Sequence, residues 1–479
     1  MLYEHAIVIG GSVGGMCAAQ ALAPFFKRVT IIDRDVYPER AEDRAGVAQS
    51  RHAHGLLARG RQGVEELFPG FRERMLARGG NEVDFPYEFA HLRATGWQQR
   101  TSSGVHTLFA SRALIEYTIR ELLQKTTNIT LLNRVEVIGL KTAPGPLHQV
   151  TGIRVRRRGN GSEEGEGAFP SEIEADLVVD ASGRSTRAPE WLRELSAEAP
   201  EETVVDCFSG YSTRWYQAPP DDRWPSDWWW RKGIWIDPLP PDHLNGATIF
   251  AIEDNRWIVT LIGYAGQYPP SDEAGFDEAL RKVRTPAIAE AVALAQPISP
   301  VYCTRAHANR FRRYELLDNP IGGFVALGDS VCVFNPAYGQ GMSASVISAL
   351  TLASCIRTTT VGLGPGLART FFREQAKALE GVWATATGAD FSIPGTQGEP
   401  PKMPAILKRY MGVLFDMARV DPVILRQTIN VVHLLKPGSA LLELPVAARV
   451  TKRMLQDLWR GGGQPEVIPP MPPPAMPVG

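Results

Sequence analysis

The sequence predicts an α/β fold in which a Rossmann-like dinucleotide-binding domain is interleaved with a mostly antiparallel β-sheet domain and followed by C-terminal helices. Glycine-containing segments at residues 10–15, 180–184 and 328–330 each follow an apolar, strand-like run. Strand-like runs dominate residues 203–310, and helical patterns follow residue 370. The chain is therefore expected to pass repeatedly between a nucleotide-binding core and a second sheet.

The first segment, GGSVGG at residues 10–15, lies between an apolar strand and helix-like sequence, and a second strand-like run ends at Asp33. In such a βαβ unit, small residues let the backbone approach a pyrophosphate, the helix N-terminus faces the phosphates, and the acidic residue binds a ribose hydroxyl. Ser12 replaces the middle glycine of the usual pattern, and an ordinary loop–helix junction is the alternative. The expected dinucleotide-binding residues are Gly10, Ser12, Val13, Gly14, Gly15, Asp33 and Arg34.

The third segment, Gly328-Asp329-Ser330, precedes a glycine-rich stretch that leads into a small-residue helix. Together the three segments resemble the boxes of flavin-dependent aromatic hydroxylases, halogenases, squalene-epoxidase-like enzymes and geranylgeranyl reductases. The resemblance implies FAD, with Asp329 on its ribityl chain and a helix start at the flavin ring, where negative charge collects on reduction. A buried glycine-rich helix contact is the alternative. The residues implied here are Asp329, Pro336, Gly339, Gly341 and Met342.

The middle segment departs from the family pattern. Hydroxylases of the para-hydroxybenzoate type carry an Asp-Gly pair where this chain has Ser182-Gly183, at a position that the family associates with FAD and NADPH contacts. A turn that leaves a buried strand is the alternative. The sequence contains one dinucleotide fingerprint, so NADPH or NADH is expected to supply electrons either directly or through a flavin reductase.

Residues 44–57 resemble the corresponding stretch of bacterial FAD epoxidases that act on polyether-precursor polyenes. This resemblance implies that Arg44 and Arg51 contact FAD. Arg112 matches an arginine that approaches FAD in the family. From the sequence alone, we would instead expect Arg112 to form an ion pair with Glu116, four residues later. For the two histidines in this stretch, the alternative is a position on the surface or at a helix cap. No third ligand lies at a useful spacing, so we expect no metal site.

The composition excludes several classes of protein. Basic and acidic residues number 51 and 52, which leaves a net charge of -1 and no signature of nucleic-acid binding. The five cysteines form no Cys-x-x-Cys pair and are expected to be free in a reducing compartment. No signal-peptide pattern precedes the first strand, and no run of about 18 apolar residues occurs, so a cytoplasmic protein without a transmembrane segment is expected.

Aromatic residues gather in the predicted sheet region. Such a cluster can exclude water and accept a large apolar or polycyclic substrate, whereas packing of a loop onto the sheet is the alternative. Residues 246–252 and 256–262 read as a β-hairpin of this sheet. The expected pocket residues are Trp215, Trp228, Trp230 and Trp235.

The domain boundaries follow from these assignments. The last helices, at 405–418 and 422–435, are expected to lie over the substrate, and the apolar residues 431–435 fit a buried face better than a membrane surface. The expected division is 1–90, 110–187 and 310–370 for FAD binding, 91–109 and 188–309 for the sheet domain, 371–460 for C-terminal helices, and 461–479 for a disordered tail.

The resemblance implies an FAD-dependent monooxygenase of secondary metabolism. A flavin C4a-hydroperoxide would epoxidise or hydroxylate a large apolar or polycyclic substrate with molecular oxygen, and no catalytic side chain is assigned. Residues 233–238 lack the first Trp of the halogenase motif, which argues against halogenation. A flavin-dependent alkene reductase and a non-catalytic protein on the same fold remain alternatives.

Overall fold

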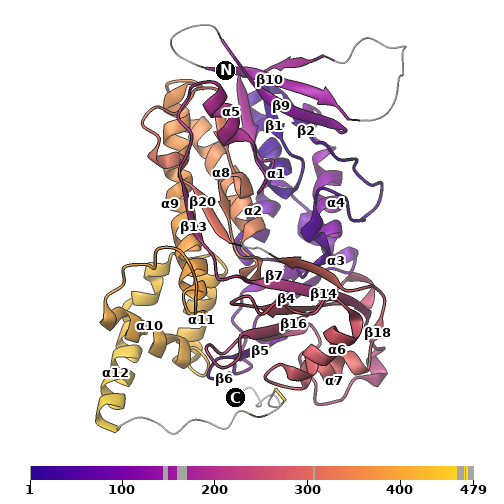
Figure 1. The fold of residues 1–479 in the computed structure, drawn as a ribbon, viewed down its shortest axis with the longest axis vertical. Coiled ribbons are helices and arrows are strands. Elements are labelled where there is room, and N and C mark those ends of the chain that lie inside the picture. The colour runs from indigo at the N-terminus through magenta and orange to yellow at the C-terminus, as the bar shows by residue number, and fades with distance from the viewer. Residues whose placement is uncertain are drawn as a thin grey trace.

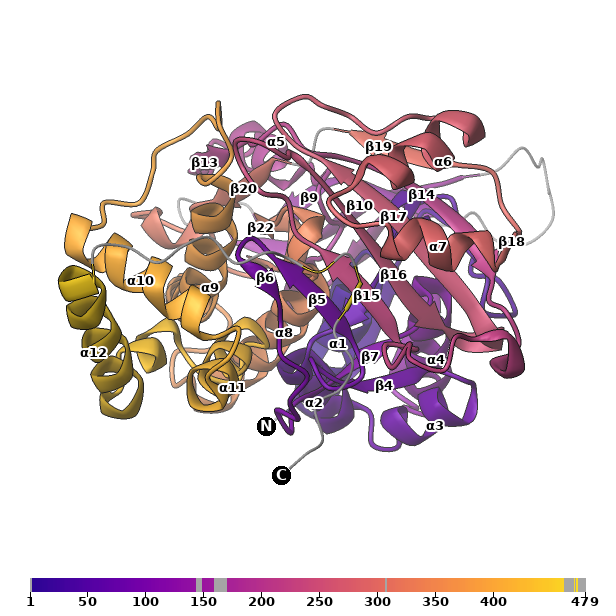
Figure 2. The same cartoon turned by 90° about the horizontal axis from the view of Figure 1, so that it is seen from below.

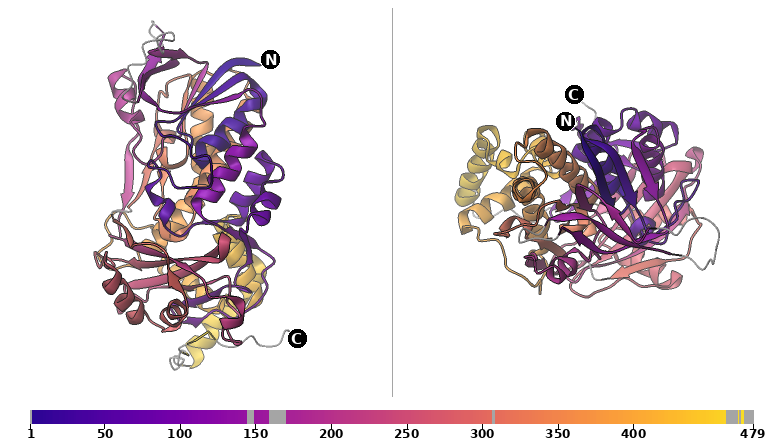
Figure 3. Two further views of the ribbon diagram at one scale, coloured as in Figure 1. Left: turned by 90° about the vertical axis from the view of Figure 1, so that its right-hand side faces the viewer. Right: turned by 90° about the horizontal axis from the view of Figure 1, so that it is seen from above.

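The computed structural model describes residues 2–143, 149–158, 170–305, 308–460, 469, 471 and 472. The molecule is elongated, with a parallel sheet and its helices at one end and an antiparallel sheet at the other (Figure 1). The last helices lie beside the antiparallel sheet, and the side view in Figure 3 shows the same separation of the two sheets. The predicted fold class is therefore confirmed.

The parallel sheet has the strand order β21-β12-β1-β2-β8. Ile9, Asp180 and Ala326 end three neighbouring strands and lie in register. Each is followed by one of the three glycine-containing segments, so the sheet brings all three to one edge. The strands are β1 Tyr3–Ile9, β2 Phe26–Ile32, β8 Ile129–Leu132, β12 Leu177–Asp180 and β21 Phe324–Ala326.

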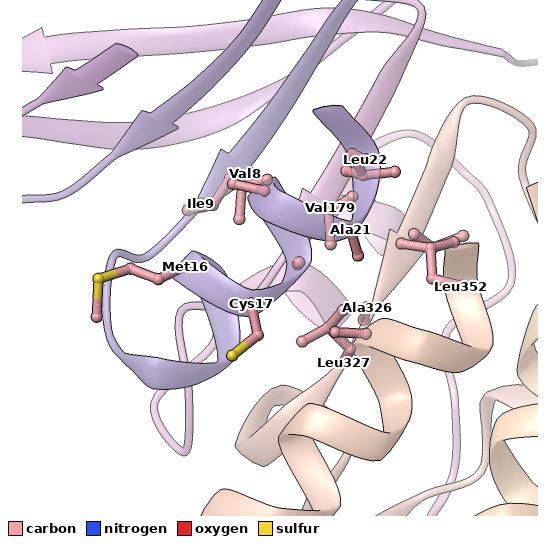
Figure 4. Close-up of a cluster of buried hydrophobic side chains, with 14 of the residues drawn as sticks. Val8, Ile9, Met16, Cys17, Ala21, Leu22, Val179, Ala326, Leu327 and Leu352 are labelled. Carbon is pink, nitrogen blue, oxygen red and sulfur yellow. The ribbon is translucent and has the colours of Figure 1, made fainter. Parts of the chain in front are cut away.

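Helix α1, Val13–Leu22, packs between this sheet and α8, Gly341–Thr358. Figure 4 shows Cys17 and Leu352 in the resulting apolar cluster, and both side chains are fully buried. Each large apolar side chain buried in this way contributes about 1.5–3 kcal/mol. Helices α2 (Ala58–Leu67), α3 (Phe71–Ala77), α4 (Arg112–Leu123), α5 (Ala188–Glu194) and α9 (Pro365–Asp390) complete this end of the molecule.

The antiparallel sheet has the order β18-β14-β17-β16-β15-β5-β6, with β19 beside β14. The predicted hairpin is confirmed as β16 and β17. Figure 2 shows α6, Glu273–Lys282, and α7, Ala287–Ala293, against one face of this sheet. The strands are β5 Ala90–Arg93, β6 Gly96–Trp97, β14 Gly210–Gln217, β15 Gly233–Ile236, β16 Asn245–Ile252, β17 Arg256–Gly263, β18 Gln296–Pro297 and β19 Tyr302–Arg305.

Smaller sheets depart from the predicted domain boundaries. Strand β7 lies between β3 and β4 rather than in the large antiparallel sheet, and β13 pairs with β20. The remaining strands are β3 Gly55–Leu56, β4 Asn81–Asp84, β7 His106–Phe109, β9 Val135–Thr142, β10 Val150–Arg157, β11 Glu172–Glu174, β13 Glu202–Val205, β20 Asn309–Arg312 and β22 Cys332–Val333.

The C-terminal helices form a core of their own. Helices α10 (Ala405–Met417), α11 (Pro422–Val432) and α12 (Leu444–Arg460) pack together, whereas α9 packs on α8 and belongs to the nucleotide-binding end. None of the helices in the described ranges is long and apolar enough to span a membrane. The predicted disordered tail lies outside the described residues except at positions 469, 471 and 472, where Trp97 Nε1 donates to the Pro469 carbonyl at 2.9 Å.

Candidate functional site

One cavity of about 1630 Å³ connects the two ends of the molecule. Its walls include Ser12 and Asp329 at the nucleotide-binding end, Trp235 on the antiparallel sheet, and Leu407 and Leu441 from the C-terminal helices. Single drug-sized ligands occupy pockets of roughly 300–1,000 Å³. The cavity therefore has room for a dinucleotide cofactor and a large substrate together.

Backbone atoms leave no room for a side chain at Gly10 or Gly15 of the fingerprint loop. Gly10 has a φ of +97°, and a Cβ there would lie 2.5 Å from the Ala181 carbonyl oxygen. A Cβ on Gly15 would lie 1.8 Å from the Gly10 carbonyl oxygen. Ser12 precedes α1 but makes no side-chain cap, so the first amides of the helix remain available to the cavity.

Ser12 connects the fingerprint loop to α4. Its hydroxyl donates to Glu116 Oε1 at 2.5 Å and accepts from Arg112 Nη2 at 2.6 Å. Arg112 also pairs with Glu116 at 2.9 Å. The serine that departs from the glycine pattern thus has a structural role. Arg112 forms the pair with Glu116 that its spacing predicts, and it also lines the cavity.

Arg44 is the centre of a buried charge cluster. Its side chain is 7% exposed and lies within 3.2 Å of carboxylate oxygens of Asp33, Asp35 and Glu116. Burial acts to raise the pKa of Glu116, but Arg112 and Arg44 outweigh it and hold this pKa below its usual value. Arg44 Nη2 is buried without a hydrogen-bond partner among the described residues, which leaves one donor for a ligand at the cavity wall.

Asp329 offers an acceptor to the cavity. None of the residues that the structure describes donates a hydrogen bond to its carboxylate, and burial raises its pKa against the opposing charges of Arg184, Arg112 and Arg312. Helix α8 begins close by, since a Cβ on Gly341 would lie 3.7 Å from Asp329 Oδ1. A hydrogen-bond acceptor at this place suits a chain with hydroxyl groups. The neighbouring helix N-terminus suits an attached ring that gains negative charge.

A buried polar network supports the loop before α8, and no sequence pattern predicts it. Asp390, at the end of α9, accepts hydrogen bonds from Asn335 at 3.0 Å and from Tyr338 at 2.5 Å. Asn309 and Tyr211 join the same network through Asp390 and Asn335. Burial raises the pKa of Asp390 despite these donors. Its members come from four distant segments, so only the folded chain brings them together.

Most of the predicted residues meet in the cavity. Arg51 does not line it: its side chain is 52% exposed and stacks over Tyr302 at 4.7 Å. Gly15 lies behind the loop and acts through close packing. The predicted residues that line the cavity are Gly10, Ser12, Val13, Gly14, Asp33, Arg34, Arg44, Arg112, Asp329, Pro336, Gly339, Gly341, Met342 and Trp235.

The predicted tryptophan wall needs correction. Trp228 and Trp230 stack at 4.8 Å in the core between the antiparallel sheet and α6 and α7, on the side away from the cavity. Trp215 lies on the cavity face of β14 but near its end, where its Nε1 donates to the Arg51 carbonyl at 2.8 Å. Only Trp235 of the four lines the cavity among the described residues. Clustering in the sequence could not show which face each Trp occupies.

Strand alternation defines the actual aromatic wall. On β16, Thr248 and Phe250 face the cavity, while Ile249 between them packs in the core toward α7. Trp235 and Phe250 lie 5.9 Å apart, ring centre to ring centre, and Phe89 is 5.7 Å from Phe250. The apolar cavity surface at this end is therefore an aromatic face of the sheet.

A comparison with curated proteins identifies a relative. Protein Rv3254 of Mycobacterium tuberculosis is 32% identical over 474 residues, which cover 95% of this chain and 94% of that protein. The chain belongs to the family of Rv3254. No protein-family model matches the sequence.

The fold of this chain is similar to that of several solved structures. The flavin-dependent brominase Bmp2 aligns over 96% of this chain and all of its own, with a TM-score of 0.65 and 12% identity. PqsL of Pseudomonas aeruginosa, a probable FAD-dependent monooxygenase, aligns over 82% of this chain and 97% of its own, with a TM-score of 0.57 and 14% identity. These similarities establish the fold that the sequence resemblance predicts.

Proposed function

We propose that this protein is an FAD-dependent monooxygenase that inserts one atom of molecular oxygen into a large apolar or polycyclic substrate. The single cavity that joins the fingerprint loop to the aromatic face carries the proposal, because it can hold a flavin and a substrate in contact. Reduced FAD would activate oxygen, and the second oxygen atom would leave as water.

The residues of the nucleotide-binding end suit FAD. Asp33 would bind a ribose hydroxyl, while the α1 amides, with Arg44 and Arg112, would face the pyrophosphate. Asp329 would accept hydrogen bonds from the ribityl chain, and the N-terminus of α8 would stabilise negative charge on the flavin ring. The apolar walls of the cavity would exclude water during the reaction.

The finer assignments belong to the same proposal. The electrons come from NADPH or NADH, directly or through a flavin reductase, and the substrate is a secondary metabolite that is epoxidised or hydroxylated. The proposed site of action is the cytoplasm. We also propose that the protein is related to the polyene epoxidases that residues 44–57 resemble.

Oxygen uptake tests the function. The protein is loaded with FAD and mixed with NADPH or NADH, with and without a flavin reductase, and a panel of polyenes, polycyclic phenols and their methyl ethers. We expect oxygen uptake that depends on substrate. Reduction of an alkene without oxygen uptake would establish the reductase instead, and a halogenated product in bromide or chloride would establish a halogenase. Failure to retain FAD would show a non-catalytic protein.

A further inference from the structure

A histidine and a carboxylate lie together on the substrate face of the antiparallel sheet. His91 on β5 pairs in register with Trp235 on the parallel neighbour β15, and Asp237 follows two residues after Trp235. Residues two apart on a strand share a face, so all three side chains point to the cavity, which they line. His91 Nε2 lies 3.1 Å from Asp237 Oδ2.

The pair is polar and charged in an otherwise aromatic wall. The His91 side chain is 12% exposed, and its ring lies 5.6 Å from Phe85, edge on, and 6.4 Å from Trp235. Aromatic side chains in edge-on and tilted positions suit contact with a further aromatic ring. The pair therefore lies where a substrate ring would bind.

Asp237 is held in its charged form. Burial acts to raise its pKa, but His91, Arg93 and Arg284 outweigh this effect and hold the pKa of Asp237 below its usual value. A carboxylate at Nε2 places the proton on that nitrogen and leaves Nδ1 as an acceptor. Nε2 lies 3.1 Å from the carboxylate without a hydrogen bond of good geometry, and no residue in the described ranges makes a hydrogen bond to Nδ1 either. Other titratable groups around the pair are Arg93, Arg284, Tyr264 and, beyond the Phe85 ring, His433.

We propose that His91 is the general base of the reaction, that Asp237 positions it, and that the substrate is a polycyclic phenol. The inference rests on the proposed function. The proton of the substrate hydroxyl passes to His91 Nδ1, and its electron pair remains on oxygen. The ring carbon ortho or para to that oxygen then bonds to one atom of the dioxygen that reduced FAD would activate, and the O–O bond breaks. The ring is oxidised, dioxygen is reduced with the two electrons of reduced FAD, and the second oxygen atom leaves as water, taking up the proton that the ring carbon loses. His91 returns the first proton to the product. The aspartate stabilises the intervening imidazolium, as an oriented carboxylate does for other histidine bases.

The choice of substrate follows from this arrangement. Epoxidation of an alkene removes no substrate proton, so it leaves a histidine base and its aspartate no proton to move. Hydroxylation of a phenol gains from a base because the phenolate ring is the better nucleophile. The structure thus favours hydroxylation over the epoxidation indicated by residues 44–57.

The test compares naphthol and hydroxyphenanthrene with their methyl ethers and with a linear polyene, using the FAD-loaded protein and measuring oxygen-dependent turnover and product mass. We expect the phenols to gain one oxygen atom and the ethers to react at least about tenfold more slowly. His91→Gln should lower kcat/KM for the phenols by about 100-fold and leave the ethers unchanged. Asp237→Asn should lower kcat for the phenols, and Asp237→Glu should recover part of it.

His243 and Asp242 are exposed residues that follow Asp237 closely in the sequence, and they supply matched controls. His243→Gln and Asp242→Asn make the same chemical changes outside the cavity and should leave turnover unchanged. Equal turnover of phenols and ethers, or an equal loss for both in His91→Gln, would overturn the assignment of the base. Oxygenation of the polyene alone would overturn the phenol assignment and leave the monooxygenase standing. Absence of oxygenation across the panel would overturn both.

Discussion

The two ends of the cavity are built in different ways. At the nucleotide-binding end, short loops are fixed by tight backbone contacts and by buried charges around Arg44. At the substrate end, aromatic side chains such as Trp235 and Phe250 come from separate strands and are closed in by the C-terminal helices. The backbone therefore defines the shape of the first end, whereas side chains define the shape of the second.

The largest expected effect concerns the buried charge cluster. Arg44→Met leaves Asp33, Asp35 and Glu116 without their shared cation, and we expect the free energy of unfolding to fall by about 3–5 kcal/mol. Urea denaturation measures this change. Arg156→Met is the control, because its exposed pair with Glu136 is worth about 0–1 kcal/mol. Equal losses in the two variants would show that the nucleotide-binding end does not depend on buried charge.

The next effect concerns the fingerprint loop. Gly15→Val places a branched side chain against the Gly10 carbonyl, so the loop must shift, and we expect FAD to bind about 100-fold more weakly, which corresponds to about 2.7 kcal/mol. Flavin fluorescence measures the affinity. Gly412→Ala on α10, where an added Cβ meets no atom within 4 Å, should leave it unchanged. An undiminished affinity in Gly15→Val would contradict the close packing of the loop.

Acid should weaken the attachment of the C-terminal helices. His433 is 5% exposed between α2 and α11, and burial lowers its pKa to about 4. The unfolded chain protonates near pH 6.5 whereas the folded chain does not, so stability is lost as the pH falls from about 7 toward 4. We expect His433 to account for roughly 2 kcal/mol of the loss between about pH 7 and 5.

Urea denaturation of His433→Gln at several pH values isolates this contribution. The variant should lose less stability on acidification than the wild type. The remaining loss has further sources, since burial also lowers the pKa of His52 to about 4 and that of His54 to about 3. An identical pH dependence in both proteins would contradict the neutral, buried state of His433.

The smallest effect separates the two faces of the antiparallel sheet. Trp235→Leu removes part of the cavity wall and should raise KM about tenfold, or about 1.4 kcal/mol. Trp228→Leu should lower the melting temperature, because Trp228 lies in the core on the other face. At temperatures where the variant is folded, its KM should be unchanged. A higher KM in Trp228→Leu would show that the substrate reaches that face.

The same comparison explains what the sequence could predict. Gly10, Asp33 and Asp329 belong to short motifs whose spacing follows from local backbone geometry, and all three line the cavity. The tryptophans required knowledge of strand register, which decides the face and which clustering in the sequence does not reveal. His91 and Asp237 lie 146 positions apart, and only the pairing of β5 with β15 brings them together.

Isotopically labelled dioxygen distinguishes insertion of oxygen from reduction of an alkene. The FAD-loaded protein is supplied with NADPH, a flavin reductase and the polycyclic phenols, and the product mass is determined. We expect a product that carries one labelled oxygen atom, formed with equal consumption of oxygen and NADPH. A product heavier by two hydrogens, formed without oxygen uptake, would contradict this expectation.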